Sequence, residues 1–331
     1  MAAASHTGGT GEHDTQKLMC KRQDSGAPGE GASDVYKPDK AYKNAAFLGS
    51  RDARPIRVLC ELSETEQRLK AAGVHNTILF YGSARARPPA AWAAQLEAAE
   101  ADLASASDEE ARAAAQACID RLHKCKWMSD LYSATADLSE RLTRWATTRP
   151  GSEDQAYVIC TGGGPGMMEA ANLGAARVEG ALSMGMGISL PFEAGLNDHV
   201  TRGLGFEFHY FMLRKFWMVY PARAVVVAPG GLGTLDELFE TLTLLQTGKI
   251  RLHAMPIVLL GKQYWSSVIN LQAMVDAGTI SEGDVKRMYM TDDVEDAFQY
   301  ITSRLEALEE EGAIQIGSTS SPTAGVSTEA P

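Results

Sequence analysis

The chain has 331 residues, of which 45% are hydrophobic, so it is long enough to bury the core of a large α/β domain. Its formal net charge of −11 argues against a general nucleic-acid or anionic-membrane surface, because such surfaces need clustered positive charge. No apolar run reaches the ~18 residues of a membrane-spanning helix, and the five cysteines contain no Cys-x-x-Cys pair. We therefore expect reduced thiols, a cytoplasmic location, and neither a disulfide framework nor a zinc site.

The two ends of the chain are polar. Residues 1–40 and 312–331 are rich in glycine and small polar residues and poor in large apolar ones, which predicts disordered tails. Between them we expect one domain over residues 41–311. Its first predicted element is a short helix over 64–72, which Gly73 ends.

Strands and helices alternate along the remaining chain. Buried strands are predicted at 77–81, 157–160, 183–190, 222–228 and 255–261. Helices are predicted from about 211 to 220 and over 234–246, 264–276 and 294–311. This alternation predicts a doubly wound parallel sheet with helices on both faces. Ligands of such sheets bind beyond the carboxyl ends of the strands.

An alanine-rich helical insertion covers about residues 88–148. Asp108 is predicted to cap a helix that begins with two glutamates. We interpret the insertion as structural and expect no chemistry from it. Its aromatic side chains, among them Trp127, Tyr132 and Trp145, are expected to bury helix faces rather than hold a cofactor.

Residues 225–237 combine a buried strand, a glycine turn and the start of a helix. Gly230, Gly231 and Gly233 are expected to let the backbone turn through positive φ with its N–H groups exposed, and Thr234 is predicted to cap the helix and offer a hydroxyl. A helix start of this kind attracts a phosphate. Glu237, one turn further on, would then face whatever carries the phosphate. The alternative is a tight strand-to-helix turn without a ligand.

A second glycine loop, residues 162–166, follows the strand at 157–160. Its spacing does not meet Gly-x-Gly-x-x-Gly, and the chain has no Gly-x-x-x-x-Gly-Lys-Ser/Thr loop, which argues against a dinucleotide fingerprint and a nucleoside-triphosphatase. Glu169 either complements the helix dipole or faces the ligand. The turn at 82–85, after the first strand, is a further candidate for ligand contact.

Arg214 and Lys215 lie in a helix that is otherwise rich in Phe, Trp, Met and Leu. An arginine in so apolar a segment is expected to have an anionic partner. One alternative remains open here: Arg214 and Glu237 could form a buried ion pair that serves only stability.

Two motifs, Gly162-Gly163-Gly164-Pro165-Gly166-x-Met168-Glu169-Ala170 and Pro229-Gly230-Gly231-x-Gly233-Thr234-x-x-Glu237, with Arg214-Lys215 before the second, resemble the Lonely Guy family. The resemblance covers residues 76–246 and implies a Rossmann-like fold. It also implies a nucleoside 5'-monophosphate phosphoribohydrolase, which needs no metal and no cofactor, with Arg214 and Glu237 as the catalytic pair. The substrate would be AMP-like or a cytokinin riboside 5'-monophosphate. The residues expected to bind the substrate or its phosphate are Gly82, Ser83, Gly163, Gly164, Gly166, Glu169, Glu193, Lys215, Gly230, Gly231, Gly233, Thr234 and Thr243.

Two other functions are weighed against this one. The first is a non-catalytic carrier of a nucleotide or phosphorylated cofactor, because related sheets bind phosphates without turnover. The second is a pyridoxal-phosphate lysine decarboxylase, for which Lys215 is the only lysine inside the motif region.

We also expect a homodimer or a larger homo-oligomer. The helices that carry Arg214 and Glu237 have more large apolar residues than one sheet face covers, and the remainder would bury against a second copy. These residues are Phe211, Phe216, Trp217, Leu238, Phe239, Leu242, Leu244 and Leu245. The resemblance implies that the sites lie at the interface between copies.

Overall fold

The computed structural model describes residues 38–149, 155–189, 195–250 and 255–316, and it divides the chain into two units, 1–49 and 50–331. The described part of the first unit holds a 3-10 helix, η1 (Ala41–Lys43), and one turn of α-helix, α1 (Ala45–Leu48). Asn44 caps α1 by accepting a hydrogen bond from the Phe47 N–H. Most of the two predicted tails, 1–37 and 317–331, lies outside the described residues.

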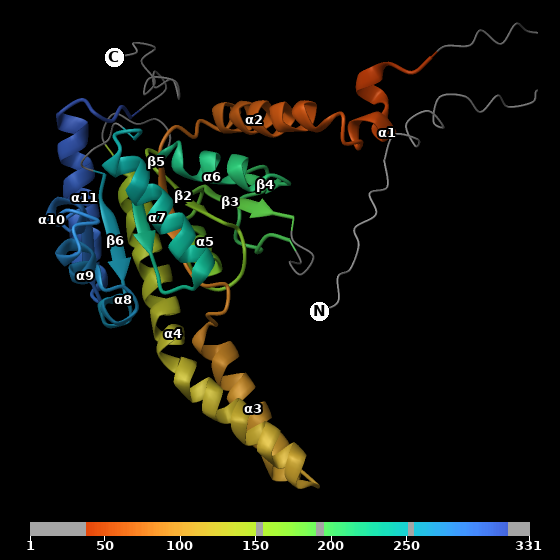
Figure 1. Cartoon of the computed structure of the whole chain (residues 1–331), viewed down its shortest axis with the longest axis vertical. Coiled ribbons are helices and arrows are strands. Elements are labelled where there is room, and N and C mark those ends of the chain that lie inside the picture. Colours follow the sequence, from red (N-terminus) through yellow and green to blue (C-terminus); the bar gives the residue numbers. More distant parts are fainter. Residues whose placement is uncertain (1–37, 150–154, 190–194, 251–254, 317–331) are drawn as a thin grey trace, which may run out of the picture. The chain divides into compact units, whose positions relative to one another are not determined.

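The described part of the second unit is built on a seven-stranded parallel sheet (Figure 1). Its strands are β1 (Thr77–Tyr81), β2 (Val158–Thr161), β3 (Ser183–Ile188), β4 (Gly205–Phe208), β5 (Ala222–Val227), β6 (Ile257–Leu260) and β7 (Met288–Thr291). The spatial order is β4-β3-β2-β1-β5-β6-β7, and every neighbouring pair is parallel. The order reverses at β1, which pairs with both β2 and β5. This confirms the predicted doubly wound, Rossmann-like fold and puts its ligand crevice beyond β1 and β5.

Alternate residues of the central strands β1 and β5 enter two separate cores, as expected for a sheet covered on both faces. Leu79 and Val225 pack in one core, and their neighbours Ile78 and Val226 pack in the other. The first core also receives side chains from α2 (Arg54–Ala71), α6 (Phe211–Val219), α7 (Leu232–Gln246) and α8 (Lys262–Val268). The second receives them from α4 (Glu109–Thr147), α5 (Met167–Ala176) and α11 (Val294–Glu310).

Five strands and most helices lie where the sequence predicts them, and the exceptions are two strands and two helices. Strands β4 and β7 were not expected. The helix predicted over 64–72 is longer, since α2 starts at Arg54. The single helix predicted over 264–276 is wrong: Ile269 is extended, and Asn270 caps a separate helix, α9 (Leu271–Asp276). A further short helix, α10 (Glu282–Val285), follows.

The insertion is a helical hairpin of α3 (Pro89–Ser105) and the first half of α4 (Figure 1). Asp108 caps α4 by accepting a hydrogen bond from Ala111 N–H at 2.7 Å, as predicted. The second half of α4 belongs to the core, where the Ser139 hydroxyl donates to the Ala171 carbonyl of α5 at 2.5 Å. Helix α4 therefore connects the insertion directly to the sheet. Among the described residues, no helix is long and apolar enough to span a membrane.

Candidate active site

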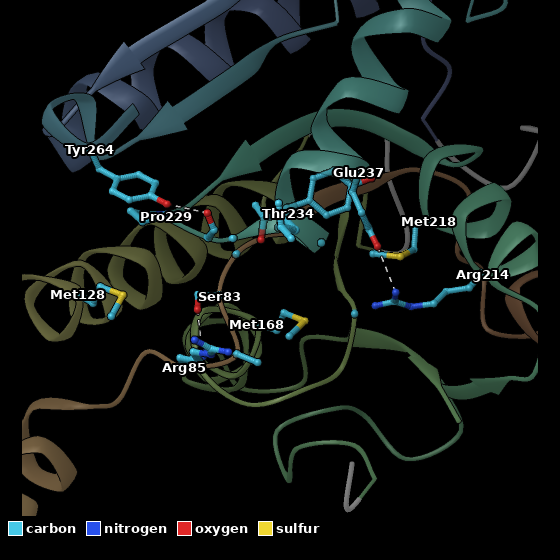
Figure 2. A pocket seen from close by; sticks show the side chains of 18 of the residues that line it. Ser83, Arg85, Met128, Met168, Arg214, Met218, Pro229, Thr234, Glu237 and Tyr264 are labelled. Carbon is cyan, nitrogen blue, oxygen red and sulfur yellow. Dashed lines mark hydrogen bonds and ion pairs between the residues drawn. The ribbon is translucent and has the colours of Figure 1, made fainter. Parts of the chain in front are cut away.

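A pocket of about 690 Å³ lies at the reversal point of the sheet (Figure 2). This volume is within the range of roughly 300–1,000 Å³ that is typical of small-molecule sites. The turns after β1, β2 and β5 contribute to its wall, together with the start of α7, one face of α6 and part of α4. The lining residues are Tyr81, Gly82, Ser83, Ala84, Arg85, Trp127, Met128, Gly162, Met168, Arg214, Met218, Pro229, Gly230, Gly231, Leu232, Gly233, Thr234, Glu237 and Tyr264.

The turn after β5 leads directly into α7, which begins at Leu232 with Gly231 as its N-cap residue. The prediction that Thr234 caps this helix is wrong: Thr234 is the third residue of α7, and the N-cap glycine has no side chain to do so. The first N–H groups of a helix have no partner within it, so those of residues 232–234 are available at the pocket. This leaves an anion-binding helix start lined by the Thr234 side chain.

The predicted positive φ is wrong for Gly230, Gly231 and Gly233, none of which adopts it. Close packing fixes the shape of this turn instead. A Cβ atom added to Gly230 would lie 2.0 Å from the Thr234 Oγ1 atom, so only glycine fits. The Tyr264 hydroxyl donates to the Gly230 carbonyl at 2.7 Å (Figure 2). Behind it, Trp265 Nε1 donates to the carbonyls of Val227 and Leu260. Helix α8 therefore holds the turn in place from the side away from Glu237.

Arg214 reaches the pocket from α6 and is fixed by three contacts. Its Nε donates to the Met186 carbonyl at 2.7 Å, and its Nη1 forms an ion pair with Glu237 Oε1 at 3.1 Å. A Cβ atom on Gly162 would lie 2.4 Å from the Arg214 Nη2 atom, so this glycine makes room for the guanidinium plane. The Arg214 side chain thus has the anionic partner that its apolar surroundings predict.

Glu237 lies in α7 and is as deeply buried as the arginine, since each side chain is 11% exposed. Burial raises the pKa of Glu237 above its ordinary value, while the charges of Arg214 and Lys215 act in the opposite direction. Its Oε1 is bound to Arg214. No hydrogen bond of Oε2 is found within the described ranges. The arrangement provides a carboxylate with one oxygen directed by an arginine and one available for chemistry.

Several predicted contact residues line this pocket, and others do not. Gly82, Ser83, Gly230, Gly231, Gly233 and Thr234 are part of its wall with Arg214 and Glu237. The structure places Gly163, Gly164, Gly166, Glu169, Lys215 and Thr243 outside the lining. Glu193 lies outside the described residues. The substrate contacts of this second group remain predictions.

The glycines of the 162–166 loop support the pocket from behind. Asn197 donates through its side chain to the carbonyls of Gly163 and Gly164, at 3.0 and 3.1 Å. Gly166 has a φ of 74°, and a Cβ atom there would lie 2.3 Å from the Ser83 carbonyl. The turn after β1 and the turn after β2 therefore pack directly on each other.

Lys215 points to two carboxylates rather than to the pocket. Its Nζ lies 2.7 Å from both Asp236 and Glu240. Burial would lower the pKa of Lys215, but the hydrogen bonds with these two acids outweigh it and raise the pKa. A lysine that forms a Schiff base reacts as the neutral amine, so this environment argues against the decarboxylase hypothesis.

The sequence analysis missed the apolar part of the pocket. Trp127 and Met128 of α4, Met168, Met218 and Tyr264 all line it. The insertion was expected to be structural and without chemistry, yet its helix α4 brings Trp127 and Met128 to the pocket wall. Tyr132 and Trp145 do bury helix faces, since Tyr132 packs on Met167 and Trp145 stacks on Tyr157. In the sequence, Trp127 differs from Tyr132 and Trp145 only in lying nearer to the tip of the insertion, and this position is the one signal that could have distinguished it.

The sequence is similar to known families and proteins. Residues 168–301 match the family model described as "Possible lysine decarboxylase". A cytokinin riboside 5'-monophosphate phosphoribohydrolase from Mycobacterium marinum is 28% identical over 179 residues, which cover 53% of this chain and 92% of the relative. The protein of the same name from Mycobacterium tuberculosis is 29% identical over 178 residues, which cover 52% and 92%.

Two solved structures are similar at lower identity. The molybdenum cofactor binding protein from Rippkaea orientalis is 20% identical with a TM-score of 0.35, covering 52% of this chain and 88% of its own. The X-ray structure of the structural-genomics target TM1055 is 18% identical with a TM-score of 0.41, covering 69% of this chain and 99% of its own.

Proposed function

Since the chain belongs to the Lonely Guy family, we propose that it hydrolyses the N-glycosidic bond of a nucleoside 5'-monophosphate to a free base and ribose 5-phosphate. One observation carries the proposal: the Arg214–Glu237 pair lines the same pocket as a helix start suited to phosphate, one turn away from it. A phosphate site and a buried carboxylate at this separation match the two ends of a ribose 5-phosphate.

The phosphate binds at the start of α7. The free N–H groups of residues 232–234 and the positive end of the helix dipole attract the anion. The Thr234 hydroxyl and Ser83, which both line the pocket, donate further hydrogen bonds. Arg85 adds a positive charge to the same wall. These interactions are equally strong in the ground state and the transition state, so they hold the substrate without activating it.

The sugar lies beside Glu237. Cleavage of the bond between C1' and the base leaves an oxocarbenium-like sugar, whose positive charge a carboxylate stabilises. The available Oε2 can also direct a water to C1'. The water's hydroxyl group bonds to C1', and its proton ends on the base nitrogen that leaves. Arg214 keeps Glu237 oriented and offers its remaining N–H groups to the oxygen atoms of the ribose.

We propose that the substrates are cytokinin riboside 5'-monophosphates, for which the two relatives are named, together with AMP and similar purine nucleotides. We also propose that the protein acts in the cytoplasm, because the four cysteines in the described ranges are free thiols.

We further propose that it forms a homodimer, with the exposed apolar side chains of α6 at the interface.

The test is an assay of purified protein with AMP, GMP, CMP and a cytokinin riboside 5'-monophosphate. Chromatography should show free base and ribose 5-phosphate in equal amounts, with no release of inorganic phosphate. Glu240→Gln serves as a control, because Glu240 is an acid on the same helix that lies outside the pocket lining. The proposal is wrong if none of the four nucleotides yields a free base.

A further inference from the structure

One end of the pocket is aromatic, and the proposed reaction does not use it. Figure 2 shows Tyr264 and Met128 on one side of the Pro229–Thr234 turn, with Glu237 and Arg214 on the other side. Trp127 lines the same pocket and stacks on Tyr264, with ring centroids 5.2 Å apart and an interplanar angle of 26°. Trp127 remains 38% exposed, so Tyr264 leaves part of its surface uncovered.

The base of the cleaved nucleotide does not fit this end. Catalysis by Glu237 requires C1' beside its carboxylate while the phosphate lies at the start of α7. Because C1' carries the base, the base then extends on the Glu237 side of the turn, away from Tyr264. This step rests on the proposed function. The aromatic end therefore lies beyond the phosphate, on its side opposite to the sugar.

A positive charge lies between the two ends. Arg85 lines the pocket opposite Thr234 (Figure 2), and no ion pair joins it to another residue of the described ranges. The other cation in the lining, Arg214, is paired with Glu237. Arg85 is exposed and therefore open to a second phosphate that continues from the first.

From these features we propose that the pocket also binds dinucleotides, in which a pyrophosphate joins the nucleotide at Glu237 to a second nucleoside. The second phosphate pairs with Arg85, and the second base stacks on Trp127. Stacking of a base on an aromatic side chain strengthens binding about tenfold or more. The hydrogen bond from Tyr264 to Gly230 connects this second-base site to the phosphate turn.

Calorimetric titration of the full chain tests the proposal with AMP, ADP-ribose and diadenosine 5',5'-diphosphate. ADP-ribose is the matched probe, because it has the pyrophosphate and the second ribose but lacks the second base. We expect diadenosine diphosphate to bind about tenfold more tightly than ADP-ribose. Trp127→Ala should remove this difference and leave the Kd of AMP unchanged, whereas Trp127→Phe should retain most of it. Arg85→Gln should raise the Kd of ADP-ribose more than the Kd of AMP.

Two results of these titrations would overturn the proposal. Equal Kd values for ADP-ribose and diadenosine diphosphate in the wild-type chain overturn the proposal. A higher Kd of AMP in Trp127→Ala also overturns it, because the substrate's own base would then lie on Trp127. If Trp127→Ala melts early, Trp127→Leu keeps the apolar volume without the flat ring. Titrations in Glu237→Gln exclude turnover of the probes. Failure of base release from AMP, with the tenfold difference intact, counts against the proposed hydrolysis alone.

Discussion

At the scale of single residues, the contact between Arg214 and Glu237 has two explanations with opposite consequences. A purely structural ion pair, 11% exposed on both sides, stabilises the fold, and the loss of one partner leaves a buried charge uncompensated. A catalytic pair is held in place by other contacts and can lose one charge without unfolding. The Met186 carbonyl and the space above Gly162 fix Arg214 independently of Glu237, which favours the second explanation.

Gly162→Ala separates the position of Arg214 from its charge. The new Cβ atom would lie 2.4 Å from Arg214 Nη2 and 2.7 Å from Met168 Sδ, so both groups must move, but the ends of flexible side chains can do so at little cost in stability. We expect kcat/KM for AMP to fall on the order of 10²-fold with a nearly unchanged Tm. Gly164→Ala is the control, since its Cβ atom would meet only the end of the Met168 side chain. Full activity of Gly162→Ala would show that the position of Arg214 is unimportant.

The burial of Glu237 predicts an unusual acid limit of activity. Burial raises the pKa of Glu237, and the carboxylate is the active form, so kcat/KM should fall at a higher pH than an exposed glutamate would cause. The effect of the same proton on stability runs in the opposite direction to its effect on activity. A raised pKa means that the folded chain binds this proton more readily than the unfolded chain. The contribution of Glu237 to the free energy of unfolding therefore increases as the pH falls through the raised pKa.

The check is a pH profile of kcat/KM for AMP in the wild type and in Glu237→Gln. The wild type should lose activity on the acid side, and the residual activity of Glu237→Gln should lack this limb. An acid limb of the same shape in both proteins would assign it to another group.

Single residues also show how far a sequence predicts a site. The glycine spacing of residues 230–233 and the acid at 237 predicted residues that the structure brings into one pocket, because both depend on local geometry. Trp127 and Tyr264 could not be identified in this way. They come from helices on either side of the motifs in the sequence and meet only because the fold brings α4 and α8 together. Aromatic residues at helical spacing ordinarily indicate a buried helix face.

At the scale of elements, the interior strands were predictable and the edge strands were not. Every residue of β1 is buried, which gives the unbroken apolar run expected in the middle of a parallel sheet. The edge strands β4 and β7 are short and partly exposed, with Glu207 pointing outward in β4. Their burial depends on their position in the sheet, and the pattern of neighbouring residues in the sequence does not reveal that position. The break between α8 and α9 was also missed, although Asn270 is a typical cap.

The packing of the second half of α4 on α5 anchors the insertion to the core, and Gly174 tests this packing. A Cβ atom there would lie 2.1 Å from the Ala136 carbonyl oxygen, and backbone atoms cannot move aside as a side chain does. Gly174→Ala should lower stability by roughly 1–3 kcal/mol. Gly283→Ala in α10 is the matched control, with its closest atom at 3.4 Å. Thermal unfolding by circular dichroism measures both; equal Tm values would contradict the close packing.

At the scale of the whole molecule, the apolar surface is smaller than the sequence indicates. Trp217, Leu238 and Leu245, which were expected to need a second copy, are buried within the chain's own core. The large apolar side chains left on α6 are Phe211, Met212 and Phe216, at 52%, 63% and 43% exposure. They lie on the helix that carries Arg214, so the predicted dimer would assemble next to the site.

Light scattering at micromolar concentration should give the mass of two chains. Met212→Glu adds a charge to the centre of this surface and should shift the mass to that of one chain. Val268→Glu is a matched control, because Val268 is an exposed apolar residue on α8. A wild-type protein with the mass of a single chain would contradict the dimer.

In the proposed reaction, Glu237 drives the attack of water on C1' of a nucleoside 5'-monophosphate. Mass spectrometry of the products formed from AMP in oxygen-18 water tests this role. The wild type should give ribose 5-phosphate with one label at C1' and unlabelled adenine, with a control for exchange of the free sugar. Glu237→Gln should bind AMP and melt like the wild type, yet form this product at least about 10²-fold more slowly. A folded Glu237→Gln that forms labelled ribose 5-phosphate at the wild-type rate would contradict the claim.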